Sequence, residues 1–199
     1  MKIGMIGLGR MGFNMARLLI GAQHDVFVYD INHEKVEQIA KFGGKPAENP
    51  KKLSTGVKIS LLSLPMPADV ESVVCGQDGI LAGSKVGHII IDLSTSDPFL
   101  TRKIAQEAQK QGVGYLDAPV LGLPQSYGKW TVPVGGQKKD FAKVSKVLAV
   151  IAEKVVYAGP SGNGNIIKLL NNLMFGAVNM ISVERVALCA KLGLDPVQF

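Results

Sequence analysis

A glycine-rich hexapeptide near the amino terminus, Gly7-Leu8-Gly9-Arg10-Met11-Gly12, constrains the fold of this chain more than any other feature. It follows a short apolar segment of strand character, Lys2–Ile6, and precedes a helical pattern over residues 13–20. In such a strand–turn–helix unit the first glycine permits the tight turn. The second lets the backbone approach a diphosphate, and the third lets the helix pack on the strand. The free N–H groups and positive dipole end of the helix favour phosphate, so all six loop residues are candidates for binding a dinucleotide.

The second strand pattern, Asp25–Tyr29, ends at an acid, Asp30. A carboxylate there can accept hydrogen bonds from both ribose hydroxyls and repels a 2′-phosphate, which favours NAD as the cofactor over NADP. Lys35 lies near enough in sequence to weaken this preference. Asp30 could instead serve only to begin the turn before the next helix.

Strand-like and helix-like segments alternate through the first 161 residues. The strand patterns cover residues 2–6, 25–29, 57–62, 88–93, 114–117, 131–134 and 154–157. The helical patterns cover residues 13–20, 33–42, 68–74, 99–111 and 141–151. This alternation predicts an α/β fold, a Rossmann-like, doubly wound and mostly parallel sheet, as a domain over residues 1–161.

A long apolar helix is expected after residue 161. Residues 165–191 contain no proline and a single glycine, Gly176, which predicts one helix of roughly 40 Å. Its middle, LLNNLMFGAVNMIS, is apolar on nearly all sides, and a helix of this kind is normally buried on most of its surface. Either the chain is truncated or a second subunit covers the helix. A homodimer or larger homo-oligomer is therefore expected.

Unusual residues follow three strands at the edge where ligands bind in open parallel sheets. Leu64-Pro65 forms a stiff loop that can lie against a cofactor or simply end a strand. Asp97 is expected to cap the next helix with Pro98 in its first position, which leaves Ser94 and Thr95 available to a ligand or to a local turn. Gly122, in the segment DAPVLGLP, allows close approach of backbone to a ligand.

Lys168 and Asn172 stand four residues apart on an otherwise apolar helix, so they share one face. Such a pair must meet polar groups or carry a desolvation penalty. It either faces a polar ligand or is a lysine that reaches solvent beside exposed asparagines.

Composition excludes several function classes. The net charge is +6, but the lysines are scattered singly or in pairs, so no nucleic-acid partner is expected. Two cysteines and three histidines lack ligand spacing, and no metal site is expected. There is no run of about 18 uncharged apolar residues and no secretory cleavage region, so we expect no membrane partner and a cytoplasmic location.

Several stretches together resemble the β-hydroxyacid dehydrogenase family, which includes 3-hydroxyisobutyrate dehydrogenase. They are, in order, IGLGRMGFNMARLL, Leu64-Pro65, IDLSTSDP, DAPVLG, VPVGG, GNGNIIKLLNN and AKLGLDP. The resemblance implies that residues 162–199 form a long interdomain helix and the start of an all-helical C-terminal domain, most of which is absent from these 199 residues.

The resemblance also implies roles for individual residues. Lys168 corresponds to the general acid/base, Asn172, Ser94 and Gly122 to substrate-binding residues, and Thr95 to a contact on the nicotinamide side. Leu121 and Leu123 depart from the family pattern, in which a serine and a second glycine are frequent.

Alcohol oxidation removes a hydride, which NAD accepts, and a proton, which a base must accept. Lys168 can be that base if burial lowers its pKa. A third, weaker interpretation is a related dehydrogenase for a phosphorylated sugar acid, which needs basic residues for the phosphate that the segment LGLPQS does not offer. Two interpretations have more support. The first is an NAD(P)-dependent oxidoreductase acting on a small 3-hydroxy acid or the corresponding semialdehyde or keto acid. The second is an NAD-binding module that is inactive alone because the C-terminal domain is absent.

Overall fold

The fold is that of a computed structural model, which describes residues 1–198. Its strands are β1 (Lys2–Ile6), β2 (Asp25–Tyr29), β3 (Lys45–Pro46), β4 (Ile59–Leu62), β5 (Ile89–Asp92), β6 (Gly114–Asp117), β7 (Thr131–Gly135) and β8 (Lys154–Gly159). Its helices are α1 (Arg10–Gly21), α2 (His33–Ala40), α3 (Pro50–Thr55), α4 (Pro67–Cys75), α5 (Ile80–Gly83), α6 (Pro98–Lys110), α7 (Lys138–Ile151) and α8 (Asn163–Lys191).

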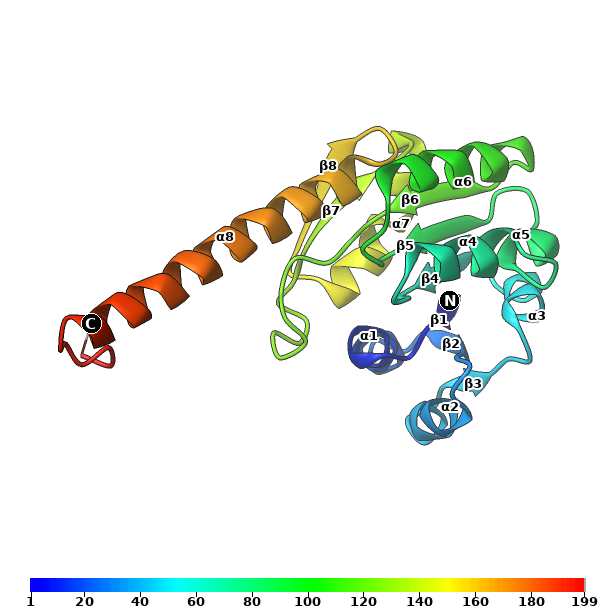
Figure 1. The fold of residues 1–199 in the computed structure, drawn as a ribbon. Helices are drawn as coiled ribbons and strands as arrows, with labels where there is room; N and C mark the ends of the chain where they lie inside the picture. The colour runs from blue at the N-terminus through cyan, green and yellow to red at the C-terminus, as the bar shows by residue number, and fades with distance from the viewer. Residues whose placement is uncertain (199) are drawn as a thin grey trace.

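The eight strands form one sheet in the order β3-β2-β1-β4-β5-β6-β7-β8 (Figure 1). All neighbouring strands are parallel except β6 and β7, which pair antiparallel. After β1, the chain adds β2 and β3 on one side of β1 and then returns to place β4 on its other side. The carboxyl ends of β1 and β4 therefore mark a topological switch point, where ligands bind in folds of this kind. The expected Rossmann-like, mostly parallel sheet is confirmed.

Two apolar clusters cover the two faces of the sheet. Along β5, Ile89 and Ile91 belong to one cluster and Ile90 to the other, as the alternation of side chains along a strand requires. The first cluster includes Leu19 of α1 and Leu148 of α7. The second includes residues of α3 to α6. Both faces are covered, which explains why the central strands are apolar at almost every position.

Three short elements lie outside the sequence-based expectations: β3, α3 and α5. α3 has only 6 residues, too few to show helical periodicity, and depends on local capping. Asn49 Oδ1 accepts the N–H of Lys52 at 2.8 Å, and Pro50 occupies the first helical position. α1 also begins earlier than its apolar pattern, at Arg10, so the glycine loop runs directly into the helix.

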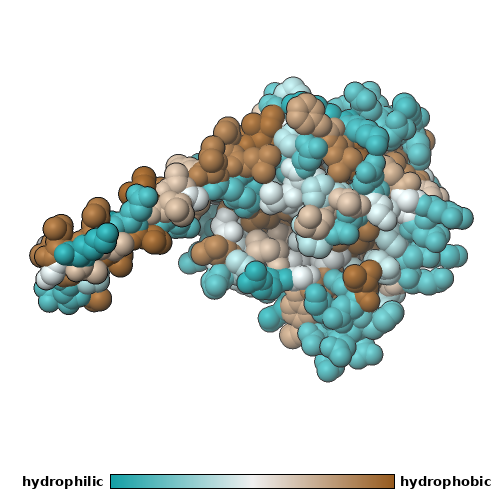
Figure 2. Space-filling model, in the orientation of Figure 1, coloured by the Kyte–Doolittle hydropathy of each residue, from teal (hydrophilic) through white to brown (hydrophobic). Residues whose placement is uncertain are grey.

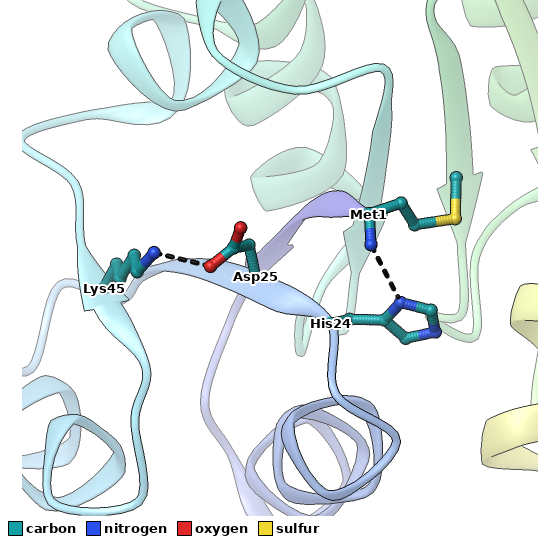
Figure 3. A network of polar contacts seen from close by, with 4 residues as sticks. All are labelled: Met1, His24, Asp25 and Lys45. Carbon is teal, nitrogen blue, oxygen red and sulfur yellow. Dashed lines mark hydrogen bonds and ion pairs between the residues drawn. The ribbon is translucent and has the colours of Figure 1, made fainter.

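The amino ends of β1, β2 and β3 carry exposed polar contacts (Figure 3). Lys45 forms an ion pair with Asp25, and the terminal amino group of Met1 lies 3.4 Å from His24 Nδ1. Exposed pairs of this kind contribute little to stability. They also lie at the end of the sheet opposite to the one that binds ligands in this class of fold.

α8 extends away from the sheet, and much of its apolar surface is exposed (Figures 1 and 2). Large side chains along it are between about 40% and 70% exposed: Leu169, Leu170, Leu173, Met174, Phe175, Val178, Met180, Ile181, Val183, Val186 and Leu188. By length and composition alone, α8 could also cross a bilayer, although such a helix by itself is weak evidence for a membrane protein. The sequence predicted this helix, but not that it could span a membrane, because it contains no run of about 18 uncharged apolar residues.

Candidate active site

A cavity of about 1,100 Å³ opens at the carboxyl ends of β1, β2, β4 and β5. It is lined by most of the residues selected from the sequence: Gly7, Gly9, Arg10, Met11, Asp30, Leu64, Pro65, Ser94, Thr95, Gly122 and Lys168. Leu8, Gly12 and Asn172 do not line it. The selected residues that do line it come from six separate parts of the chain, and the fold brings them together at the switch point.

The three glycines of the hexapeptide differ in their surroundings. Gly7 has a φ of 86°, and a Cβ there would lie 2.3 Å from the carbonyl oxygen of Ser63. A Cβ on Gly12 would lie 1.9 Å from the carbonyl oxygen of Gly7, so this glycine allows the helix to approach the loop. A Cβ on Gly9 would meet nothing within 4 Å. Gly9 caps α1 at the cavity, and the space above it is open to a ligand.

Asp30 lies at the end of β2, buried except for a small part that faces the cavity. Its Oδ2 accepts the N–H of Leu8 at 2.6 Å, and its Oδ1 accepts the N–H of Asn32 at 2.8 Å. The carboxylate therefore fixes the glycine loop as well as facing the cavity, and its remaining lone pairs can accept further hydrogen bonds. The side chain of Leu8 is buried, which explains why only its backbone serves the site.

The loops after β4 and β5 are tied to each other. Ser94 is buried, and its Oγ accepts the N–H of Leu64 at 2.9 Å. Thr95 is exposed and lines the cavity. The expected cap of α6 is confirmed, because Asp97 Oδ1 accepts the N–H of Phe99 at 2.9 Å and Pro98 opens the helix. Ser94 therefore has a structural role, because it holds the two loops together, in addition to any contact that it makes with a ligand.

Lys168 points from α8 toward the end of the sheet. Its Nζ donates a hydrogen bond to the carbonyl oxygen of Val120 at 2.7 Å, and burial lowers the pKa of its amine. Gly122, two residues beyond Val120, has a φ of 139°, and a Cβ there would lie 2.7 Å from Trp130 Cδ1. Asn172 is exposed, one turn farther along α8.

Sequence reasoning missed a group of buried polar residues beneath the cavity. Asp92 and Asp117 are the last residues of β5 and β6, paired in register and fully buried. Asp92 accepts hydrogen bonds from the N–H of Ser94 at 2.9 Å and the hydroxyl of Tyr115 at 2.8 Å. Burial raises the pKa of Asp92 to about 6, with a smaller contribution from the charge of Asp117. An acid at the last position of a buried strand, as in IIID and GYLD, is the sequence signal that could have pointed to these two residues.

Comparison with known proteins places this geometry in a family. Residues 2–159 match the family described as the NAD binding domain of 6-phosphogluconate dehydrogenase. The chain is 37% identical over 198 residues to 2-(hydroxymethyl)glutarate dehydrogenase of Eubacterium barkeri, which covers 98% of this chain and 65% of that protein. It is 35% identical over 196 residues to 3-hydroxyisobutyrate dehydrogenase of Pseudomonas aeruginosa, over 98% of this chain and 66% of that protein.

A solved structure agrees with these matches. The Mycobacterium tuberculosis 3-hydroxyisobutyrate dehydrogenase, described with L-serine, superposes with a TM-score of 0.91 at 28% identity, over 98% of this chain and 66% of that one. The chain thus spans about two thirds of the length of these relatives. On the family match, the sequence identities and the shared fold, the chain belongs to the β-hydroxyacid dehydrogenase family, of the 3-hydroxyisobutyrate dehydrogenase type, and carries its NAD(P)-binding domain.

Proposed function

We propose that this chain is the cofactor-binding and catalytic part of an NAD-dependent dehydrogenase. Its substrate is a small 3-hydroxy acid, or in reverse the corresponding semialdehyde or keto acid. The observation that carries the proposal is the presence of Lys168 in the same cavity as the glycine loop and Asp30. The relatives named for 2-(hydroxymethyl)glutarate and 3-hydroxyisobutyrate support the substrate class, because both names describe acids with a hydroxymethyl group next to the carbon that bears a carboxylate.

The residues around the cavity fit a dinucleotide. The start of α1 offers backbone N–H groups and a positive dipole end for the diphosphate, and the open space above Gly9 allows its approach. Arg10, beside it, adds a positive charge. Asp30 would accept hydrogen bonds from the adenosine ribose, which favours NAD over NADP. Leu64, Pro65 and Thr95 line the same cavity and would contact the cofactor, Thr95 on its nicotinamide side.

Lys168 is the proposed general base, which accepts the hydroxyl proton of the substrate and returns it in the reverse direction. When bound, the nicotinamide supplies a two-electron acceptor for the hydride that leaves the carbinol carbon. The Nζ of Lys168 takes the hydroxyl proton as the C–H and O–H bonds break and the C=O bond forms. A lysine can do so only in its neutral form, and burial lowers its pKa in that direction. A neutral amine can donate to the carbonyl of Val120 and still offer its lone pair to the substrate.

Ser94 and Gly122 line the same cavity as Lys168, and we assign them to the substrate carboxylate. Asn172, on the same helix face as Lys168, orients the substrate oxygen. In this chain Asn172 is exposed and lies outside the cavity. Leu121 and Leu123 make the neighbouring segment more apolar than the family pattern.

A second copy of the chain is the proposed cover of α8. The exposed side chains from Leu169 to Leu188 form an apolar surface, and exposed surfaces of this size mark interaction sites. A homodimer or larger homo-oligomer buries them against an identical surface, since two-fold assemblies use self-complementary patches. We also propose that residues 162–199 form a long interdomain helix and the start of an all-helical C-terminal domain.

The alternative is an NAD-binding module that does not turn over substrate by itself, a reading that the exposure of Asn172 favours. The two are separated by measuring NADH formation from NAD with a panel of 3- and 4-carbon hydroxy acids, together with NAD affinity. Reduction of NAD with at least one 3-hydroxy acid supports the dehydrogenase. NAD binding without turnover of any of them supports the module.

A further inference from the structure

The amino end of α8 has no cap of its own. Gly162 occupies the N-cap position with a φ of 92° and no side chain. Helices commonly begin with a side-chain oxygen that accepts the N–H of the second or third helical residue. In α8 this oxygen comes from a different element. Asp117, at the end of β6, accepts the N–H of Gly162 with Oδ1 at 2.8 Å and that of Asn165 with Oδ2 at 3.0 Å. A buried carboxylate thus stands on the positive end of the helix dipole.

The backbone around Asp117 is shaped to admit this carboxylate. A Cβ on Gly135 of β7 would lie 2.5 Å from Asp117 Oδ1. A Cβ on Gly164 of α8 would lie 2.4 Å from the carbonyl oxygen of Asp117 and 2.9 Å from its Oδ2. Side chains at either position would push the helix or the neighbouring strand away. The two glycines therefore permit the close contact between α8 and the sheet.

Asn165 forms a second anchor. Its side chain is fully buried, its Oδ1 accepts the N–H of Ser96 at 3.1 Å, and its Nδ2 donates to Thr101 Oγ1 at 3.1 Å. Ser96 belongs to the loop after β5, and Thr101 to the first turn of α6. Hydrogen bonds between buried residues therefore tie the first turn of α8 to β6, to the loop after β5 and to α6.

This anchored turn determines where Lys168 can reach. Lys168 follows Asn165 by three residues, so the rotation and height of the first turn set the direction of its side chain. In the described part of α8, Gly164 and Asn165 are its buried residues, and the helix beyond Lys168 is mostly exposed. The attachment of this helix to the sheet thus depends on its first turns.

We propose that Asp117 and Asn165 are positioning residues: together they hold the amino end of α8 against the ends of β5 and β6, and so place the Nζ of Lys168 at the cavity. Neither residue lines the cavity, so neither acts on the substrate directly. The inference rests on the proposed role of Lys168. Its test follows the lysine itself and does not depend on turnover.

The test uses the 199-residue chain labelled with ¹³C-lysine. The Lys168 signal is assigned by its loss in Lys168→Arg, and its pKa is measured by NMR titration in Asp117→Asn, Thr101→Val and Thr101→Ser. Asp117→Asn replaces one acceptor oxygen by an NH₂ group that faces a backbone donor. We expect the pKa of Lys168 to rise toward the ordinary lysine value and the amides of Gly162 and Asn165 to exchange with solvent at least about tenfold faster.

The Thr101 pair provides a milder perturbation if Asp117→Asn does not fold. Thr101→Val removes the acceptor of Asn165 Nδ2 and should move both readouts in the same direction by a smaller amount. Thr101→Ser keeps the hydroxyl and should restore wild-type values. Ser54→Ala is the matched control, because it removes a buried hydroxyl bonded to the carbonyls of Lys51 and Ile80, away from α8, and should change neither readout.

Unchanged pKa of Lys168 and unchanged amide exchange in the folded variants would overturn the proposal. NAD affinity should stay within about twofold in all of them, because the glycine loop and Asp30 are untouched. A wild-type chain that oxidises no hydroxy acid, but whose Lys168 pKa follows Asp117 and Thr101 as described, would refute the proposed function and support the positioning role.

Discussion

Replacing Gly9 by alanine should weaken dinucleotide binding without harming the fold. Gly9 has φ −65° and ψ −174°, a conformation open to any L-residue, and a Cβ there meets nothing within 4 Å. Alanine loses some N-cap preference relative to glycine, which costs up to about 1 kcal/mol. It also restricts the unfolded chain, which stabilises by about 0.4–1 kcal/mol. The two effects oppose each other, so the free energy of unfolding should change by less than about 1 kcal/mol.

Binding should respond much more strongly. The added methyl group occupies the space through which a diphosphate approaches the N–H groups of α1. Each hydrogen bond to a charged group is worth about 1.5–3 kcal/mol, so losing one or two of them lowers NAD affinity by about tenfold to a hundredfold or more. The assay is calorimetric titration with NAD, beside urea denaturation of the same samples.

Two other glycine-to-alanine variants make the result interpretable. Gly21→Ala, at the end of α1, also adds a Cβ that meets nothing within 4 Å and should leave affinity unchanged. Gly12→Ala places a Cβ 1.9 Å from the carbonyl oxygen of Gly7 and should destabilise the fold by about 1–3 kcal/mol or more. If Gly9→Ala binds NAD as tightly as the wild type, the diphosphate does not rest on this loop and the reasoning is refuted.

Three further predictions concern stability, cofactor choice and assembly. Burial lowers the pKa of His88 from 6.5 to about 4, so the unfolded chain binds more protons between these values. The stability that His88 contributes is therefore complete above pH 6.5 and is lost as the pH falls to about 4. The difference in unfolding free energy between wild type and His88→Gln should therefore change by about 3 kcal/mol across that window. Taking the difference between the two proteins cancels the titration of Asp92, whose raised pKa acts in the opposite direction. A difference that stays constant with pH would contradict this prediction. Asp30→Asn should reduce the preference for NAD over NADP by about tenfold or more in equilibrium titrations, and an unchanged ratio would remove Asp30 as the determinant. Leu173→Asp, at a side chain 70% exposed, should shift the chain toward monomer in light scattering, and an unaltered mass would place the interface elsewhere.

Much of this fold could be predicted because its signals are local. The glycine loop, Asp30 and the cap at Asp97-Pro98 each depend on residues within a few positions of one another. The central strands are recognisable because both faces of the sheet are covered and the strands are apolar throughout. α3 and α5 could not be predicted in this way, because they are too short for a helical period to show in the sequence.

The site could be predicted only in part, because its supports are long-range. The residues that face the cavity follow strand ends, and the general rule for parallel sheets brings them together. The bonds from Asp117 to Gly162 and Asn165 join residues more than 40 positions apart, and no local pattern reports them. Asn172 shares the helix face of Lys168, yet it lies outside the cavity, since spacing along a helix fixes direction but not what the helix faces.

The most direct measurement of the central claim compares wild type with Lys168→Ala in two assays on the same preparation: NAD affinity, and the rate of NADH formation from the best hydroxy acid of the panel. Loss of the lysine amine should lower the rate by at least about a hundredfold, the contribution typical of a general acid or base, while NAD affinity stays within about twofold. A Lys168→Ala protein that retained most of the wild-type rate would contradict the account.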